Sequence, residues 1–124
     1  MNNLVFWITG ASSGIGLGLF HYLNERGIKT VISSRDRDKL EQIKKESKFP
    51  NLVGVVRVDL EKFETLEAAT QEAVAIFGRI DVLINNGGIS QRDLVVNTNF
   101  EVDQRLMNIN YLGTIKLTKS LLPH

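Results

Sequence analysis

Eight residues decide how this chain folds: Thr9-Gly10-Ala11-Ser12-Ser13-Gly14-Ile15-Gly16. They directly follow the apolar run Leu4–Ile8, which is typical of a buried strand. Beyond them, apolar residues recur every four positions up to Gly27, and this spacing predicts a helix. The glycine-rich stretch therefore joins the end of a strand to the start of a helix. Free N–H groups and the positive end of the helix dipole can hold a phosphate at such a junction.

The three glycines of this stretch have separate expected roles. Gly10 permits a tight turn, Gly14 lets the backbone approach a ligand, and Gly16 lets the helix and the strand pack closely. An ordinary flexible turn is the alternative, but a flanking strand and helix are the context that a dinucleotide site requires. A P-loop is not indicated, because its glycines end in Gly-Lys and this sequence has no such pair.

The spacing Thr-Gly-x-x-x-Gly-x-Gly resembles that of the short-chain dehydrogenase/reductase family, in its compact single-domain branch. The resemblance extends over the whole chain, and it implies a nicotinamide dinucleotide cofactor. The contacts expected from this stretch are Thr9, Gly10, Ser12, Ser13, Gly14, Ile15 and Gly16.

Length and composition indicate a single globular domain, and no metal site is expected. The 124 residues are 43% hydrophobic and 23% charged, as in a soluble globular protein. A net charge of +1 gives no electrostatic case for nucleic acid, and the absence of cysteine excludes thiolate metal sites. No apolar run approaches the length of a membrane span, and the first strand leaves no room for a secretory signal. We therefore expect a cytoplasmic protein.

Apolar runs alternate with amphipathic stretches along the chain. The runs are Leu4–Ile8, Ile28–Ile32, Leu52–Val58 and Val82–Ile84. Strands that alternate with helices predict a parallel sheet with helices on both faces. We expect a Rossmann-type, doubly wound α/β fold of four βα units with strand order 3-2-1-4, in one dinucleotide-binding domain over residues 1–124.

The residues after the second run bear on the choice of cofactor. In dinucleotide folds an acid at this point bonds the ribose 2′-hydroxyl of NAD, whereas an Arg accommodates the 2′-phosphate of NADP. This chain has Ser34 where the acid would stand, and Arg35 follows it. NADP is therefore favoured over NAD, although Arg35 could instead be a solvated residue paired with Asp36.

The third run ends in Asp59 and Leu60. An Asp at the carboxyl end of a parallel strand is often a helix N-cap. The family resemblance implies a second role, in which the Asp59 carboxylate accepts from the exocyclic amine of adenine and the Leu60 N–H donates to the ring. The two roles are compatible.

The fourth run is followed by Asn85-Asn86-Gly87-Gly88. A loop is the simple interpretation, but the block follows a strand that lies beside the first one, where open α/β sheets bind ligands. It resembles the Asn-Asn-Ala-Gly motif of the family, with Gly87 in place of Ala. The resemblance implies that Asn86, Gly87 and Gly88 brace the sheet and lie against the cofactor.

One catalytic residue is expected in this chain. Asn110 interrupts the apolar stripe of a helix predicted over about residues 100–122, and helix-interior Asn is usually structural. The resemblance implies instead that Asn110 orients the catalytic Lys of a proton relay, as in the Asn-x-x-Gly motif of the family. The catalytic Ser and Tyr-x-x-x-Lys pair of the family are missing, because Tyr22 is followed by Arg26 and Tyr111 by Ile115 at the Lys position.

Three functions are compatible with these features. The leading hypothesis is an NADP(H)-dependent short-chain oxidoreductase that interconverts an alcohol and a carbonyl of a small molecule, of which this chain is the N-terminal, cofactor-binding part. Alone, the chain is then expected to be inactive. A non-enzymatic NAD(P)-binding module is the alternative, and an epimerase of the same fold is weaker because its glycine spacing differs. A homo-oligomer is possible, and neither a membrane nor a nucleic-acid partner is expected.

Overall fold

The computed structural model describes residues 3–86. Four parallel strands form one sheet in the order β3-β2-β1-β4. The strands are β1 (Val5–Thr9), β2 (Lys29–Ser33), β3 (Val53–Val55) and β4 (Val82–Asn85). The order 3-2-1-4 predicted from the spacing of the apolar runs is confirmed. It places the carboxyl end of β1 between those of β2 and β4.

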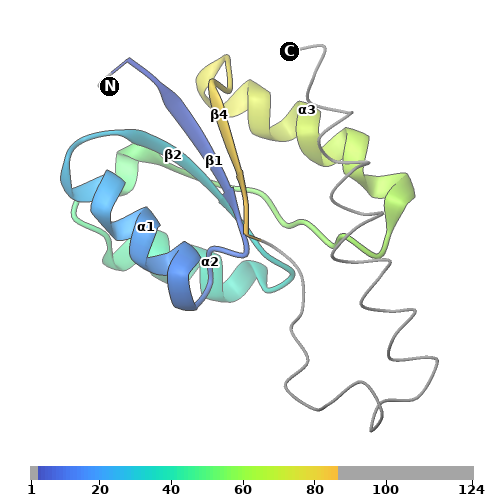
Figure 1. The fold of residues 1–124 in the computed structure, drawn as a ribbon, viewed down its shortest axis with the longest axis horizontal. Coiled ribbons are helices and arrows are strands. Elements are labelled where there is room, and N and C mark those ends of the chain that lie inside the picture. Colours follow the sequence, from blue (N-terminus) through green and yellow to red (C-terminus); the bar gives the residue numbers. More distant parts are fainter. Residues whose placement is uncertain (1–2, 87–124) are drawn as a thin grey trace, which may run out of the picture.

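Helices cover both faces of the sheet (Figure 1). They are α1 (Gly14–Glu25), α2 (Arg37–Glu46) and α3 (Leu66–Phe77), with short 3-10 helices η1 (Pro50–Leu52) and η2 (Phe63–Thr65). The first two α-helices lie on one face and α3 lies on the other, as in a doubly wound fold (Figure 1). Among the described helices, none has the length and apolar character needed to cross a membrane.

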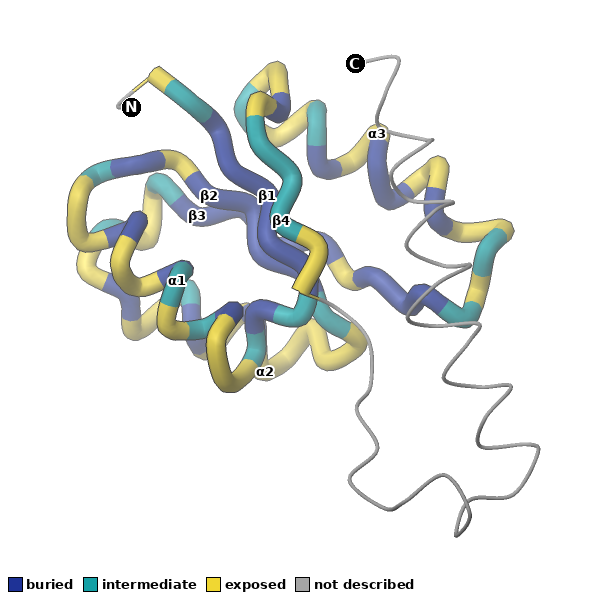
Figure 2. The backbone as a smooth tube through the Cα atoms, in the orientation of Figure 1, coloured by how far each residue is buried: buried dark blue, intermediate teal, exposed yellow. Residues whose placement is uncertain are grey.

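The alternation of side chains along β1 explains the two layers of core. Phe6 and Ile8 pack with residues of α1 and α2, whereas Val5 and Trp7 pack with residues of α3. A strand with apolar residues at every position is buried on both faces, which is the pattern of a central parallel strand. Figure 2 shows the result, a buried sheet between helices whose outer surfaces are exposed.

The third strand is shorter than the sequence predicts. The apolar run Leu52–Val58 indicated a strand, but the regular strand covers only Val53–Val55. The chain nevertheless stays beside β2, since the N–H groups of Val56 and Val58 donate to the carbonyls of Ile32 and Ser34 at 3.1 and 2.9 Å. The regular ladder ends at the pair of Ile32 and Val55, one residue before the last residue of β2.

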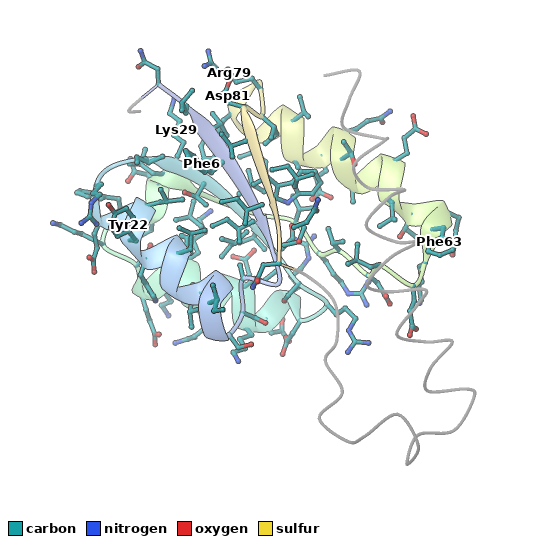
Figure 3. The ribbon with its side chains drawn as sticks, in the orientation of Figure 1. Phe6, Tyr22, Lys29, Phe63, Arg79 and Asp81 are labelled. Carbon is teal, nitrogen blue, oxygen red and sulfur yellow. The ribbon has the colours of Figure 1, made fainter. Side chains whose placement is uncertain are left out.

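An ion pair fixes the amino end of the sheet, far from the glycine-rich stretch (Figure 3). The Asp81 carboxylate accepts from the Arg79 Nε and from the Val5 backbone N–H, each at 2.8 Å. The hydrogen bond from Arg79 and then that from Val5 hold the pKa of Asp81 below its usual value. These contacts tie the start of β1 to the residues just before β4.

Candidate functional site

The glycine-rich stretch has the backbone geometry expected of it. Gly10 and Gly14 have φ angles of +66° and +59°, in the left-handed region that favours glycine. Gly16 is buried, and a Cβ there would collide with the Gly10 carbonyl oxygen and lie 2.7 Å from Asn86 Nδ2. The helix therefore begins in close contact with the end of β1, as the spacing predicted.

The first turn of α1 is suited to an anionic ligand. Its N-cap, Ser13, makes no side-chain capping hydrogen bond, and the first turn contains no acidic residue. The N–H groups that begin a helix have no partner within the helix itself. Gly14 is exposed, a Cβ at that position would meet no atom within 4 Å, and Ile15 is 81% exposed. A phosphate group fits this position because N–H groups, helix dipole and free space coincide there.

Hydrogen bonds join this loop to both neighbouring strands. The Ala11 N–H donates to the Ser33 carbonyl at 3.1 Å, which connects the loop to the end of β2. On the other side, the Asn86 N–H donates to Thr9 Oγ1 at 3.1 Å, and Asn86 Nδ2 donates to the Gly10 carbonyl at 3.4 Å. Thr9 is buried, whereas Asn86 is exposed and contacts the loop from the end of β4.

The end of β2 presents an arginine that no acid neutralises within the described part of the chain. Ser34 accepts the Asp36 N–H on its hydroxyl, and Arg35 is exposed. Asp36 does not pair with Arg35, contrary to one interpretation of the sequence. Its carboxylate caps α2 by accepting the Lys39 N–H at 3.1 Å, since the free N–H groups of a helix start need an acceptor. No ion pair between described residues involves Arg35.

Beside Arg35 lies an open hollow of about 500 Å³. Its lining residues are Arg35, Asp36, Arg37, Asp38, Arg57 and Asp59. Sequence reasoning missed Arg57, whose Nε donates to the Arg35 carbonyl at 2.9 Å. The parallel register of the second and third apolar runs was the signal that could have brought these two arginines together.

Asp59 and Leu60 follow at the same edge of the sheet. Asp59 Oδ1 accepts the Glu61 N–H at 3.0 Å, and the Asp59 carbonyl accepts the Lys62 N–H at the same distance. This is a turn, and η2 separates it from α3, whose N-cap is Thr65. The interpretation of Asp59 as a helix N-cap is therefore wrong. The Leu60 side chain is buried in the core beside α3.

Three of the predicted site residues, Gly87, Gly88 and Asn110, lie outside the described residues. The other predicted residues gather along one edge of the sheet, at the carboxyl ends of the strands. The structure thus combines a helix start without a side-chain cap, at α1, with an arginine at the end of β2 that has no ion pair among the described residues. Within residues 3–86, no cluster of acidic or histidine side chains is placed to hold a metal ion.

Comparison with known proteins gives consistent matches. The family described as short chain dehydrogenase matches residues 4–124. Dehydrogenase/reductase SDR family member 7 of Mus musculus is 44% identical, with 100% of this chain matched to 38% of that protein. The chain therefore spans less than half the length of this curated relative.

Two solved structures share the fold. One is 3-ketoacyl-(acyl-carrier-protein) reductase of Brucella melitensis complexed with NADH, with a TM-score of 0.86 and 30% identity. The match covers 99% of this chain and 50% of that one. The other is a variant of actinorhodin polyketide ketoreductase with NADPH, with a TM-score of 0.85 and 27% identity over 96% of this chain and 46% of that one.

Proposed function

Because this chain belongs to the short chain dehydrogenase family, we propose that it forms the cofactor-binding part of an oxidoreductase that uses NADP(H) to interconvert an alcohol and a carbonyl. The observation that carries the proposal is the arrangement at one sheet edge, where the uncapped start of α1 lies beside the unpaired Arg35. A bound nicotinamide cofactor supplies or accepts the hydride in this chemistry.

In this proposal the glycine-rich loop binds the pyrophosphate of the cofactor. N–H groups of the first turn of α1 point out of the helix, and no acidic side chain competes for them there. The loop keeps its form because Ala11 is bonded to β2 and Asn86 bonds Gly10 from β4. Rigid support of this kind lowers the entropic cost of binding.

In this proposal the residues at the end of β2 select NADP over NAD. The Ser34 hydroxyl carries no charge that would repel a 2′-phosphate, and the exposed Arg35 guanidinium offers a planar fork of donors for it. NADP is therefore the proposed cofactor over NAD. Of the two similar structures, one is with NADPH and the other is complexed with NADH, so the proposed preference rests on this chain's own residues.

In this proposal Asp59 and Leu60 bind the adenine ring. One carboxylate oxygen of Asp59 is bonded to the Glu61 N–H, and the other remains for the exocyclic amine. No described residue accepts the Leu60 N–H, so it is free to donate to the ring. This division of donor and acceptor matches the edge of adenine.

Hydride transfer to a carbonyl also needs a proton donor. We propose that residues beyond this sequence complete the enzyme, because Tyr22 and Tyr111 both lack a lysine four positions later. The match to only 38% of the mouse relative supports this. Asn110 would then orient the proton relay of the complete enzyme. The non-enzymatic NAD(P)-binding module stays the second candidate, favoured by the same absence of the Tyr-x-x-x-Lys pair.

The test is to titrate the 124-residue chain with NADPH and NADH and to assay it with carbonyl substrates. We expect NADPH to bind more tightly and no turnover to occur. Arg35→Ala should reduce the NADPH/NADH preference about tenfold, the effect of one charge-assisted hydrogen bond pair. Arg26→Ala, on the exposed surface after α1, is the matched control and should leave the preference unchanged.

Two results would contradict the proposal. If Arg35→Ala keeps the NADPH/NADH preference of wild type, Arg35 is a surface residue without a role in cofactor choice. If the 124-residue chain turns over a carbonyl substrate, the proton donor does not lie beyond this sequence. If a longer protein containing this chain binds NADPH but reduces no carbonyl, the binding-module function replaces the enzymatic one.

A further inference from the structure

Arg57 lies on the face of the sheet that α1 and α2 cover. Val53 and Val55 pack on that face, and the next residue in the alternation is Arg57. Its neighbours Val56 and Val58 are buried against α3 on the opposite face, so Arg57 is the exposed residue between two buried ones. This position brings it to the end of β2, where the Val58 N–H bonds the Ser34 carbonyl.

One bond of Arg57 ties it to the residue proposed to select the cofactor. Its Nε donates to the carbonyl of Arg35 at 2.9 Å, across 22 positions of sequence. A guanidinium has five N–H donors, so four remain for another acceptor. No ion pair between described residues involves Arg57. By contrast, the neighbouring Arg37 pairs with Glu72 of α3 at 3.6 Å.

The charges that line the hollow favour the phosphate of a bound nucleotide over a free anion. Its lining holds three arginines and three aspartates, so it has no excess of positive charge that would attract any anion. Asp36 is engaged in capping α2 and Asp59 in its turn. The third aspartate, Asp38, lies in the first turn of α2. Of the three arginines, only Arg35 and Arg57 have no ion pair with a described residue, and the Arg35 carbonyl joins them. Such a pair suits a phosphate that the rest of a bound nucleotide delivers to it.

We propose that Arg57 is a second determinant of cofactor choice, which fixes the Arg35 peptide through its Nε and offers its outer N–H groups to the ribose 2′-phosphate of NADP. This inference rests on the proposed function and deepens it. It assigns Arg57 a positioning effect on Arg35 and a direct attraction for the phosphate.

Two ligands that differ only in the 2′-phosphate provide the test. The affinities of the 124-residue chain for 2′,5′-ADP and for 5′-ADP are measured by calorimetry in wild type and in Arg57→Gln. We expect the variant to lose about tenfold in affinity for 2′,5′-ADP and less than about twofold for 5′-ADP. The matched control is Arg26→Gln, which removes the same charge from the other end of the sheet and should change neither affinity.

Two further variants separate the two effects. Arg57→Lys keeps the charge but removes the Nε donor to the Arg35 carbonyl, so its affinity for 2′,5′-ADP should lie between those of Arg57→Gln and wild type. The positioning effect predicts that Arg35→Gln is less harmful in the Arg57→Gln background than alone, because Arg35 is then already misplaced. Circular dichroism of each variant checks that it is folded, as expected for substitutions at exposed positions.

The failures of the two proposals are distinguishable. If wild type binds neither ADP, the proposed dinucleotide function fails and this inference fails with it. If wild type prefers 2′,5′-ADP and Arg57→Gln keeps that preference, the role of Arg57 is refuted while the proposed function stands. Equal losses in Arg57→Lys and Arg57→Gln would overturn the direct attraction of Arg57 for the phosphate, since its charge would then not matter.

Discussion

A single methyl group at Gly16 tests the geometry of the glycine-rich loop. In Gly16→Ala the new Cβ would overlap the Gly10 carbonyl oxygen and lie 2.7 Å from Asn86 Nδ2. The first of these is backbone, so the loop itself must move. Overpacking of this kind costs about 1–3 kcal/mol, and the better helix propensity of Ala returns about 1 kcal/mol. We expect a net loss of up to about 2 kcal/mol in the free energy of unfolding.

Gly18 offers a matched control two residues further along the same helix. A Cβ at Gly18 meets no atom within 4 Å, and the residue is exposed. Gly18→Ala should therefore stabilise the chain by about 1 kcal/mol through helix propensity alone. The same substitution is thus expected to lower the free energy of unfolding at Gly16 and to raise it at Gly18. The comparison therefore controls for the general effect of replacing glycine by alanine.

The assay is urea unfolding followed by circular dichroism, together with titration by NADPH. Gly16→Ala should lower the unfolding midpoint and weaken NADPH binding, because the moved loop no longer aims its N–H groups at the pyrophosphate. Gly18→Ala should raise the midpoint and leave the affinity unchanged. Equal stability and equal affinity in Gly16→Ala and wild type would refute the packing attributed to Gly16.

Two further predictions concern the sheet. Ser33→Ala leaves the fully buried Trp7 indole N–H without its acceptor at 2.8 Å and should cost about 1–3 kcal/mol, read from the fluorescence of the chain's one tryptophan during urea unfolding. An unchanged midpoint would contradict the importance of that bond. The lowered pKa of Asp81 stabilises the fold above the unfolded pKa of about 4, and this contribution is lost as pH falls through the folded pKa. Wild type should therefore lose stability relative to Asp81→Asn in acid, and parallel pH profiles of the two proteins would contradict this.

Local sequence patterns predicted the sheet because each strand is a short apolar run and each connection is regular. The roles of Gly10 and Gly16 in the turn and in close packing were also readable, since a strand before and a helix after define the junction. The carboxyl end of β3 was less readable. The apolar run continues to Val58, but the regular ladder with β2 ends at Val55, and the apolar pattern does not mark that point.

The polar contacts of the site were predicted less completely, because each depends on competing partners. From the sequence, Asp36 could pair with Arg35 or cap α2. In the structure its carboxylate accepts the Lys39 N–H and caps the helix. Asp59 could begin a helix, but η2 intervenes and its carboxylate closes a turn instead. Arg57 became visible only when the register of two strands brought it to the Arg35 carbonyl.

The most direct measurement is an NMR titration of the isotope-labelled 124-residue chain with NADPH. A dinucleotide held at the carboxyl edge of the sheet predicts saturable amide shifts concentrated in residues 10–16, in Arg35 and in residues 57–60. NADH should shift the first group and leave Arg35 and Arg57 nearly unchanged. Shifts confined to other surfaces, or none that saturate, would contradict a cofactor site at this edge.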